Sequence, residues 1–229
     1  MKKVLALVVV FAIALIGANA AFAKIANSKH DLSTLSYTGT HLSSCQYCHA
    51  PHNPVDQTAA PLWNRSATAN AGLTNYTFYG TTFAAGAPGL QSITCLSCHD
   101  GVLAITATKI NQRGNADTLP NDAGNIVSGK IASGNALIGP SLSNDHPVGV
   151  VFGASGTAGV STTFSAFANG YATVNSTVYR AYGTVPGNAK VECSSCHDPH
   201  GLDYAQADVT SPFLRGSIET ICSDCHNNK

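Results

Sequence analysis

The 229-residue sequence has few charged side chains, few aromatic side chains and a single methionine. Charged residues make up 10% of the chain, and 12 basic residues balance 12 acidic ones. This balance excludes a polybasic nucleic-acid-binding protein and an acidic disordered tail. Aromatic residues amount to 7%, so an ordinary aromatic and aliphatic core would be thin. The chain has instead eight cysteines and nine histidines, and these residues carry its chemistry.

The N-terminus has the pattern of an export signal. Two lysines precede an apolar run over Val4–Ile16, and Ala21-Phe22-Ala23 supplies a small-residue cleavage pattern. The run is shorter than the roughly 20 residues that span a membrane, which disfavours the alternative of an uncleaved anchor. The sequence therefore predicts a signal peptide over residues 1–23 and an exported protein that does not span the membrane.

All eight cysteines belong to four copies of one motif, Cys-x-x-Cys-His. In a c-type cytochrome the two sulfurs of this motif bind haem covalently and the histidine binds one face of the iron. A disulfide framework needs no histidine after every second cysteine, and zinc sites would leave surplus ligands. The motifs predict four c-type haems. Their residues are Cys45, Cys48 and His49; Cys95, Cys98 and His99; Cys193, Cys196 and His197; and Cys222, Cys225 and His226.

The second axial ligand of each iron is predicted to be histidine. Met1, the only methionine, leaves with the signal peptide, so methionine ligation is excluded. Closed coordination at each iron favours an electron-transfer protein over an enzyme. The alternative, a multihaem oxidoreductase, needs one haem without a distal histidine. The candidates outside the motifs are His30, His41, His52, His146 and His200.

Two of these candidates follow a motif histidine at the same spacing. His52 and His200 each lie three residues after a haem-binding histidine, too close to reach the opposite face of the same haem. Each is therefore expected to bind a neighbouring haem. We assign His52 to the haem of Cys95 and Cys98, and His200 to the haem of Cys222 and Cys225.

The first and third haems remain for the other candidates. His146 lies in a turn-forming segment beside Asp145 and Pro147, and His30 lies on an N-terminal arm. We expect these two histidines to be ligands. His41 is the spare or alternative ligand, because it lies only four residues before Cys45.

The motifs divide the chain after the signal peptide into three parts. Residues 24–100 carry the first two haems, 191–229 carry the last two, and 101–190 form an insert rich in Gly, Ala, Ser, Thr and Asn. The predicted fold is a mostly coil multihaem cytochrome c with a core of haems. Short helices, single turns, are expected at the motifs, and a few short strands in the insert. The β-prone stretches are Val102–Ile110, Val148–Phe152 and Thr162–Tyr182.

Three segments resemble a known family. They are Asn27-Ser28-Lys29-His30-Asp31, the stretch from Cys45 to Asn53, and Pro61-Leu62-Trp63-Asn64. Together with the four motifs, they are similar to the extracellular tetrahaem cytochromes of metal-reducing bacteria, of the outer-membrane cytochrome E type, called cytochrome nanowires.

The resemblance implies bis-histidine haems stacked as a chain inside a homopolymeric filament, with one distal histidine supplied by the neighbouring subunit. It further implies other multihaem cytochromes as electron donors and extracellular or metal-oxide acceptors, with no nucleic-acid partner. The alternatives are a soluble periplasmic electron carrier and a mainly structural fibre.

The N-terminal arm over Lys24–Tyr37 precedes the first haem and is the segment expected to reach a second subunit. If His30 on this arm binds a haem of the next copy, the contact is head-to-tail. A head-to-tail contact that does not close on itself generates an open filament.

Overall fold

The computed structural model describes a little under half of the chain. The described residues are 25, 28–34, 43–50, 52, 62–64, 77–78, 81–82, 88–102, 105, 124–139, 141–151, 166–168, 171–174, 177–183, 189–201 and 213–226. Residues 1–23 and His41 lie outside this set, so the signal peptide and the role of His41 remain predictions. Among the described residues, no helix has the length and apolar character needed to cross a membrane.

The helices are short and gather at the four motifs. Within the described residues, two 3-10 turns, η2 and η3, lie near the N-terminus, and three α-helices, α2, α3 and α4, carry the later motifs. Their bounds are Leu32–Thr34, Ser44–Tyr47, Leu90–His99, Cys193–Cys196 and Ile221–Cys225. The prediction of helix at the motifs is confirmed, but α2 is longer than the expected single turn. It begins five residues before Cys95, where Gly89 has an extended backbone.

The strands that the structure describes are two to four residues long and form four small antiparallel sheets. Strands β6, β7 and β8 pair in that order, β1 pairs with β2, β3 with β4, and β5 with β9. The bounds of β1 to β9 are Thr77–Phe78, Thr81–Thr82, Ile126–Val127, Lys130–Ile131, Val150–Val151, Ala166–Ala168, Tyr171–Val174, Thr177–Arg180 and Lys190–Val191.

The expected strands are present in two of the three β-prone stretches. The first of these stretches lies largely outside the described residues, while the other two contain β5 to β8. Strands β1 and β2 lie before the insert and were not expected. Ser128 and Gly129 both have positive φ between β3 and β4, the conformation of a two-residue turn that matches strand twist. The mostly coil fold is thus confirmed.

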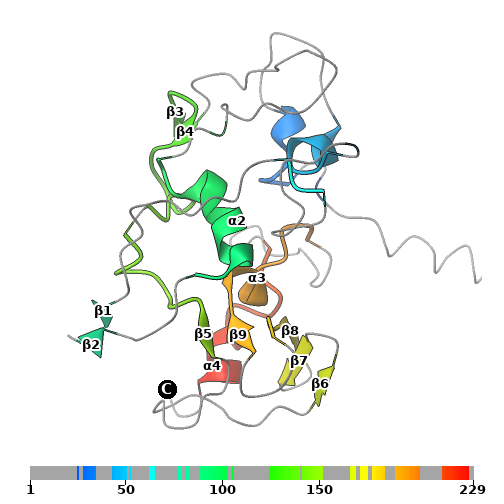
Figure 1. Cartoon of the computed structure of the whole chain (residues 1–229), viewed down its shortest axis with the longest axis vertical. Coiled ribbons are helices and arrows are strands. Elements are labelled where there is room, and N and C mark those ends of the chain that lie inside the picture. The colour runs from blue at the N-terminus through cyan, green and yellow to red at the C-terminus, as the bar shows by residue number, and fades with distance from the viewer. Residues whose placement is uncertain are drawn as a thin grey trace, which may run out of the picture.

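The insert packs directly on the C-terminal motifs. Strand β5, from the insert, pairs with β9, which ends one residue before the α3 N-cap residue Glu192. Strand β8 contacts α3, and α3 in turn contacts α2. Figure 1 shows α3 directly below α2 and the β5–β9 pair below α3. Motifs distant in sequence are therefore neighbours in space.

Buried apolar residues of the described part of the chain form three small clusters. Each cluster has only three or four buried residues and packs against cysteines of the motifs. Tyr179 and Ile221 lie with Cys196 and Cys225, Tyr47 and Ile105 with Cys48 and Cys98, and Leu96 and Leu142 with Cys193. The apolar side chains are thus distributed around the motifs.

Candidate metal centres

Each motif forms a helical turn that brings its two cysteines to one side. The backbone N–H of the histidine donates to the carbonyl of the first cysteine in the motifs of His49, His197 and His226, at 2.8 to 3.0 Å. In α2, Cys95, Cys98 and His99 continue a regular helix. Residues three apart lie on the same helical face, so the two sulfurs of each motif point in one direction. No disulfide joins any of the eight cysteines.

Three motif histidines lie opposite three histidines from outside the motifs. The ring centres are 6.1 Å apart for His30 and His99, 6.0 Å for His49 and His200, and 6.0 Å for His146 and His226. Each pair contains one histidine of a Cys-x-x-Cys-His motif and one distal candidate.

This spacing matches two imidazoles on a single metal ion. A metal–imidazole bond is about 2.0 Å long and a ring centre lies about 1 Å behind its nitrogen, so axial imidazoles have centres about 6 Å apart. The ring planes of His49 and His200 are 16° apart, and those of the other two pairs are 63° apart. The three pairs therefore have the spacing of axial ligands.

Backbone carbonyls fix the tautomer of three of these histidines. The Nδ1 atoms of His30, His99 and His146 lie 3.3, 2.7 and 2.9 Å from the carbonyl oxygens of Pro199, Ala136 and Pro147. A carbonyl oxygen only accepts hydrogen bonds, so each Nδ1 carries the proton and donates it. The lone pair is then on Nε2, the nitrogen left to bind a metal.

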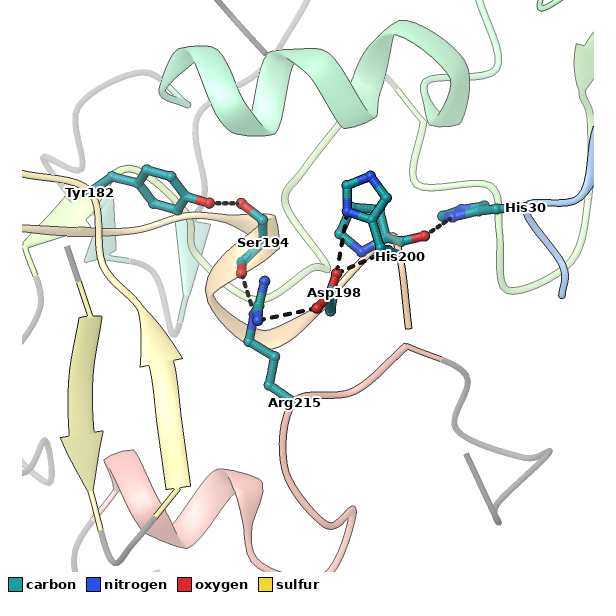
Figure 2. Close-up of polar contacts among 7 residues, drawn as sticks. His30, Tyr182, Ser194, Asp198, His200 and Arg215 are labelled. Carbon is teal, nitrogen blue, oxygen red and sulfur yellow. Dashed lines mark hydrogen bonds and ion pairs between the residues drawn. The ribbon is translucent and has the colours of Figure 1, made fainter. Parts of the chain in front are cut away.

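A carboxylate orients His200. Asp198 Oδ1 lies 3.7 Å from His200 Nδ1 and accepts the His200 backbone N–H at 2.9 Å. Arg215 lies 3.5 Å from the other carboxylate oxygen and donates to the Ser194 carbonyl at 2.9 Å. Figure 2 shows this connected set, with His30 approaching from the N-terminal arm. The set places His200 toward the first motif.

These pairings differ from those expected from sequence order. His200 faces His49 rather than His226, and the ring facing His226 belongs to His146. His30 faces His99, so the N-terminal arm reaches a motif of its own chain. The packing of α2 on α3 places the second and third motifs side by side, a neighbourhood that the order of the motifs along the chain did not predict.

His52 and His197 are the two candidates without a facing imidazole at this spacing within the described residues. His52 is exposed. His197 follows α3, and its side chain is also exposed. The structure does not bring His52 to His99, the histidine of the haem to which we assigned it, because His30 occupies that place.

Burial keeps the histidines neutral and the thiols protonated. Desolvation lowers the pKa of His30, His146 and His200, so their imidazoles are in the metal-binding form at neutral pH. Desolvation also raises the pKa of Cys196 to about 11 and that of Cys225 to about 12. Both thiols are therefore protonated at neutral pH.

The same backbone clasp holds the first and third motifs. Each clasp consists of three residues, 62–64 and 213–215, that were not recognised as functional from sequence. The first residue accepts an N–H bond from Ala50 or Asp198, at 2.8 and 2.7 Å. The third donates its backbone N–H to the carbonyl of Cys48 or Cys196, at 2.9 and 2.8 Å.

The third clasp residue also donates from its side chain. Asn64 Nδ2 donates to the Gln46 carbonyl at 3.0 Å, and Arg215 Nε donates to the Ser194 carbonyl at 2.9 Å. The two carbonyls occupy the same place in their motifs. A proline precedes each clasp, Pro61 and Pro212, and the first clasp lies within the Pro61–Asn64 segment whose family resemblance was noted from the sequence.

The residues around the motifs fit a covalently bound haem. Eight thiols outside any disulfide, three imidazole pairs and small apolar clusters beside the cysteines would supply the attachment, ligation and packing that haem needs. The Trp63 Nε1 atom is buried without a hydrogen-bond partner in the described part of the chain, and its ring meets that of His49 at 5.9 Å. This donor suits an acidic group such as a haem propionate. The described residues contain no cluster of three or more His, Cys, Asp or Glu side chains suited to a metal ion held by protein alone.

Comparison with protein families identifies the C-terminal region. Residues 186–229 match the family model of the doubled CXXCH motif. This match and the motifs show a multihaem c-type cytochrome region, with covalently bound haem iron and a role in electron transfer. No curated protein matches the chain.

Proposed function

We propose that the protein is an exported tetrahaem c-type cytochrome whose haems are ligated by two histidines each, and that it conducts electrons as the subunit of an extracellular filament. The observation that carries the proposal is the set of three imidazole pairs at 6.0 to 6.1 Å. Bound haem iron supplies reversible one-electron oxidation and reduction. The chain's own residues supply attachment, two-sided ligation and short paths between neighbouring motifs.

Three haems find both ligands within one chain under this proposal. His99 and His30 would hold the haem of Cys95, His49 and His200 that of Cys45, and His226 and His146 that of Cys222. Two histidines on each iron would leave it no coordination position for a substrate. Such irons are suited to electron transfer and not to catalysis.

The haem of Cys193 and Cys196 would take its second ligand from a neighbouring copy. His197 lacks a facing ring in the described residues, while His52 is exposed and lacks one too. Each chain thus has one haem that needs a second histidine and one exposed histidine that can supply it to another chain. This arrangement supports a head-to-tail contact, which builds an open filament when it does not close. His52 thus replaces His30 as the bridging ligand, and His41 is the alternative. The resemblance to cytochrome nanowires supports the same arrangement.

The experiment combines mass, spectroscopy and microscopy of the secreted wild-type protein. We expect a chain beginning at residue 24 with four attached haems, only low-spin iron in the oxidised protein, and filaments by electron microscopy. Fewer attached haems would refute the tetrahaem assignment. Four low-spin haems in a monomeric protein would favour a soluble periplasmic carrier, with His41 or His52 acting within the chain.

A second candidate, a multihaem oxidoreductase, is favoured by the exposed His197 without a facing ring. Such an enzyme keeps one five-coordinate iron, which gives a high-spin signal in the wild-type protein. A high-spin signal in assembled filaments would therefore support the enzyme, whereas its absence there supports electron transfer.

A further inference from the structure

Glu192 is a carboxylate buried between two haem-binding helices. It lies immediately before Cys193, and only 1% of its surface is exposed. Removing a carboxylate from water is costly unless hydrogen bonds or an opposite charge compensate. No lysine or arginine of the described residues lies within ion-pair distance of it. Hydrogen bonds therefore hold this side chain.

The donors come from the start of α2. The Gly89 backbone N–H lies 3.0 Å from both carboxylate oxygens, and the Ser92 hydroxyl donates to one of them at 2.5 Å. The same hydroxyl accepts the backbone N–H of Cys193 at 3.0 Å. The N-terminus of a helix favours negative charge, which adds to these contacts. Glu192 thereby joins α2 to α3.

Gly89 is required for this approach. A Cβ atom at position 89 would lie 2.3 Å from Glu192 Oε1 and 2.8 Å from its Cδ atom. Any other residue would force the carboxylate away from α2. The close contact therefore depends on the residue types at both positions, glycine at 89 and glutamate at 192.

The contact joins the attachment sites of two haems. Helix α2 carries Cys95 and Cys98, and α3 carries Cys193 and Cys196. The Cys95 and Cys193 thiols are close enough for each to shift the pKa of the other, upward for Cys95 and downward for Cys193. Burial raises the pKa of Glu192, while Ser92, Gly89 and Lys190 oppose that rise and favour the carboxylate.

We propose that Glu192 is a positioning residue that locks the second and third haem segments together and lowers the reduction potentials of their two haems. The inference rests on the proposed function. An iron that gives up one electron gains one positive charge, and a nearby buried anion stabilises that oxidised form. The effect is selective, because Glu192 contacts the segments of Cys95 and Cys193 and neither of the other two motifs.

The test is Glu192→Gln in the full haem-loaded protein, in mildly alkaline buffer, with each haem potential followed by its own NMR signals. Glutamine keeps the shape and an acceptor oxygen but removes the charge. We expect the haems of Cys95 and Cys193 to become easier to reduce by about threefold to tenfold in equilibrium constant, while the haem of Cys45 changes much less. The matched control is Glu219→Gln, an exposed acid outside the contact, which should shift none of them.

Equal shifts at all four haems, or no shift at the selected two, would overturn the proposal. If Glu192→Gln fails to accumulate, Ser92→Ala removes the shortest hydrogen bond to the carboxylate and should move the same two potentials in the same direction by less. If the potentials of these two haems do not shift selectively in Ser92→Ala, the proposal is wrong. Four low-spin haems without a selective shift would leave the proposed function standing, whereas missing haems in the wild type would remove the proposed function itself.

Discussion

The two Cys-x-x-Cys-His-x-Pro-His segments, at residues 45–52 and 193–200, share a backbone arrangement but differ at one buried position. Both are held by the same clasp hydrogen bonds. The residue after the motif histidine is Ala50 in the first segment and Asp198 in the second, and both are buried. Only Asp198 can orient the last histidine of its segment, as it does for His200.

The consequence is a different role for two histidines with identical spacing. His200 is oriented by its own segment and faces His49. His52 has no carboxylate in the corresponding place and is exposed. We infer that one segment completes a site within the chain and the other is suited to offer its histidine to a neighbour. The clasp and the buried residue, rather than the motif, determine this difference.

The largest expected effect comes from replacing these two histidines separately. His52→Ala should abolish filaments and make the haem of Cys193 and Cys196 high-spin, because its bridging ligand is lost. His200→Ala should make the haem of Cys45 and Cys48 high-spin and leave filaments in place. Both variants should retain four attached haems. Spectroscopy with haem-specific assignment, beside electron microscopy, checks the pair.

Two outcomes would contradict this contrast. Filaments that persist in His52→Ala but disappear in His41→Ala would transfer the bridging role to His41. A high-spin haem at Cys222 in His200→Ala would restore the pairing expected from sequence order.

Sequence reasoning found the motifs and the distal candidates but could not find their pairing. The Cys-x-x-Cys-His spacing is a local property, and adjacent residues reveal it. His49 and His200 come from segments that are far apart in the sequence, and local spacing does not encode a contact of this kind. The order of the motifs along the chain does not predict which histidines pair when the sheets and helices are this short.

The same limit applies to the fold. Low aromatic content and high Gly, Ser, Thr and Asn content correctly indicated a mostly coil chain with short strands. The length of α2 was missed because its first turn is stabilised by Glu192, which lies about 100 residues later. The clasps were missed because their hydrogen bonds are made mainly by backbone atoms, which leave little trace in sequence.

Asp198→Ala should have the next largest effect, on both stability and haem ligation. The substitution gives the second segment the alanine that the first has at position 50. It leaves the Arg215 guanidinium buried without its carboxylate, and breaking a buried ion pair costs roughly 3 kcal/mol. His200 would lose its orientation, so part of the haem at Cys45 should become high-spin. Urea unfolding of the haem-loaded protein measures the first effect and its absorption spectrum the second.

Asp198→Asn is the control that separates the loss of the charge from the loss of the side chain's shape. The amide keeps a hydrogen-bond acceptor for the His200 backbone N–H but removes the ion pair. A stability equal to that of the wild type would show that the ion pair contributes nothing, and would contradict the role given to Arg215.

Asn64→Ala should produce a smaller loss, because the first clasp contains no ion pair. The substitution removes the bond to the Gln46 carbonyl and leaves that acceptor without its donor, at a cost of about 1 to 2 kcal/mol in unfolding free energy. Low-spin ligation should persist at every haem, since the backbone bonds to Cys48 and Ala50 remain. Urea unfolding compared with Asp198→Ala checks the order of the two effects, and a larger loss in Asn64→Ala would reverse the comparison.

The smallest expected effect concerns the first residue of the first clasp. Leu62 has a φ of 57°, in the left-handed region that costs a non-glycine residue roughly 1 kcal/mol, and 43% of its surface is exposed. Leu62→Gly relieves this strain but adds conformational entropy to the unfolded chain, worth about 0.4 to 1 kcal/mol in the opposite direction. The two terms nearly cancel, so unfolding free energy should change by less than about 1 kcal/mol. Leu62→Ala is the matched control, because it keeps the Cβ atom and the strain while removing the same exposed side chain. Glycine should therefore be at least as stable as alanine at position 62. A glycine variant clearly less stable than the alanine variant would show that the left-handed backbone of this clasp carries no strain to relieve.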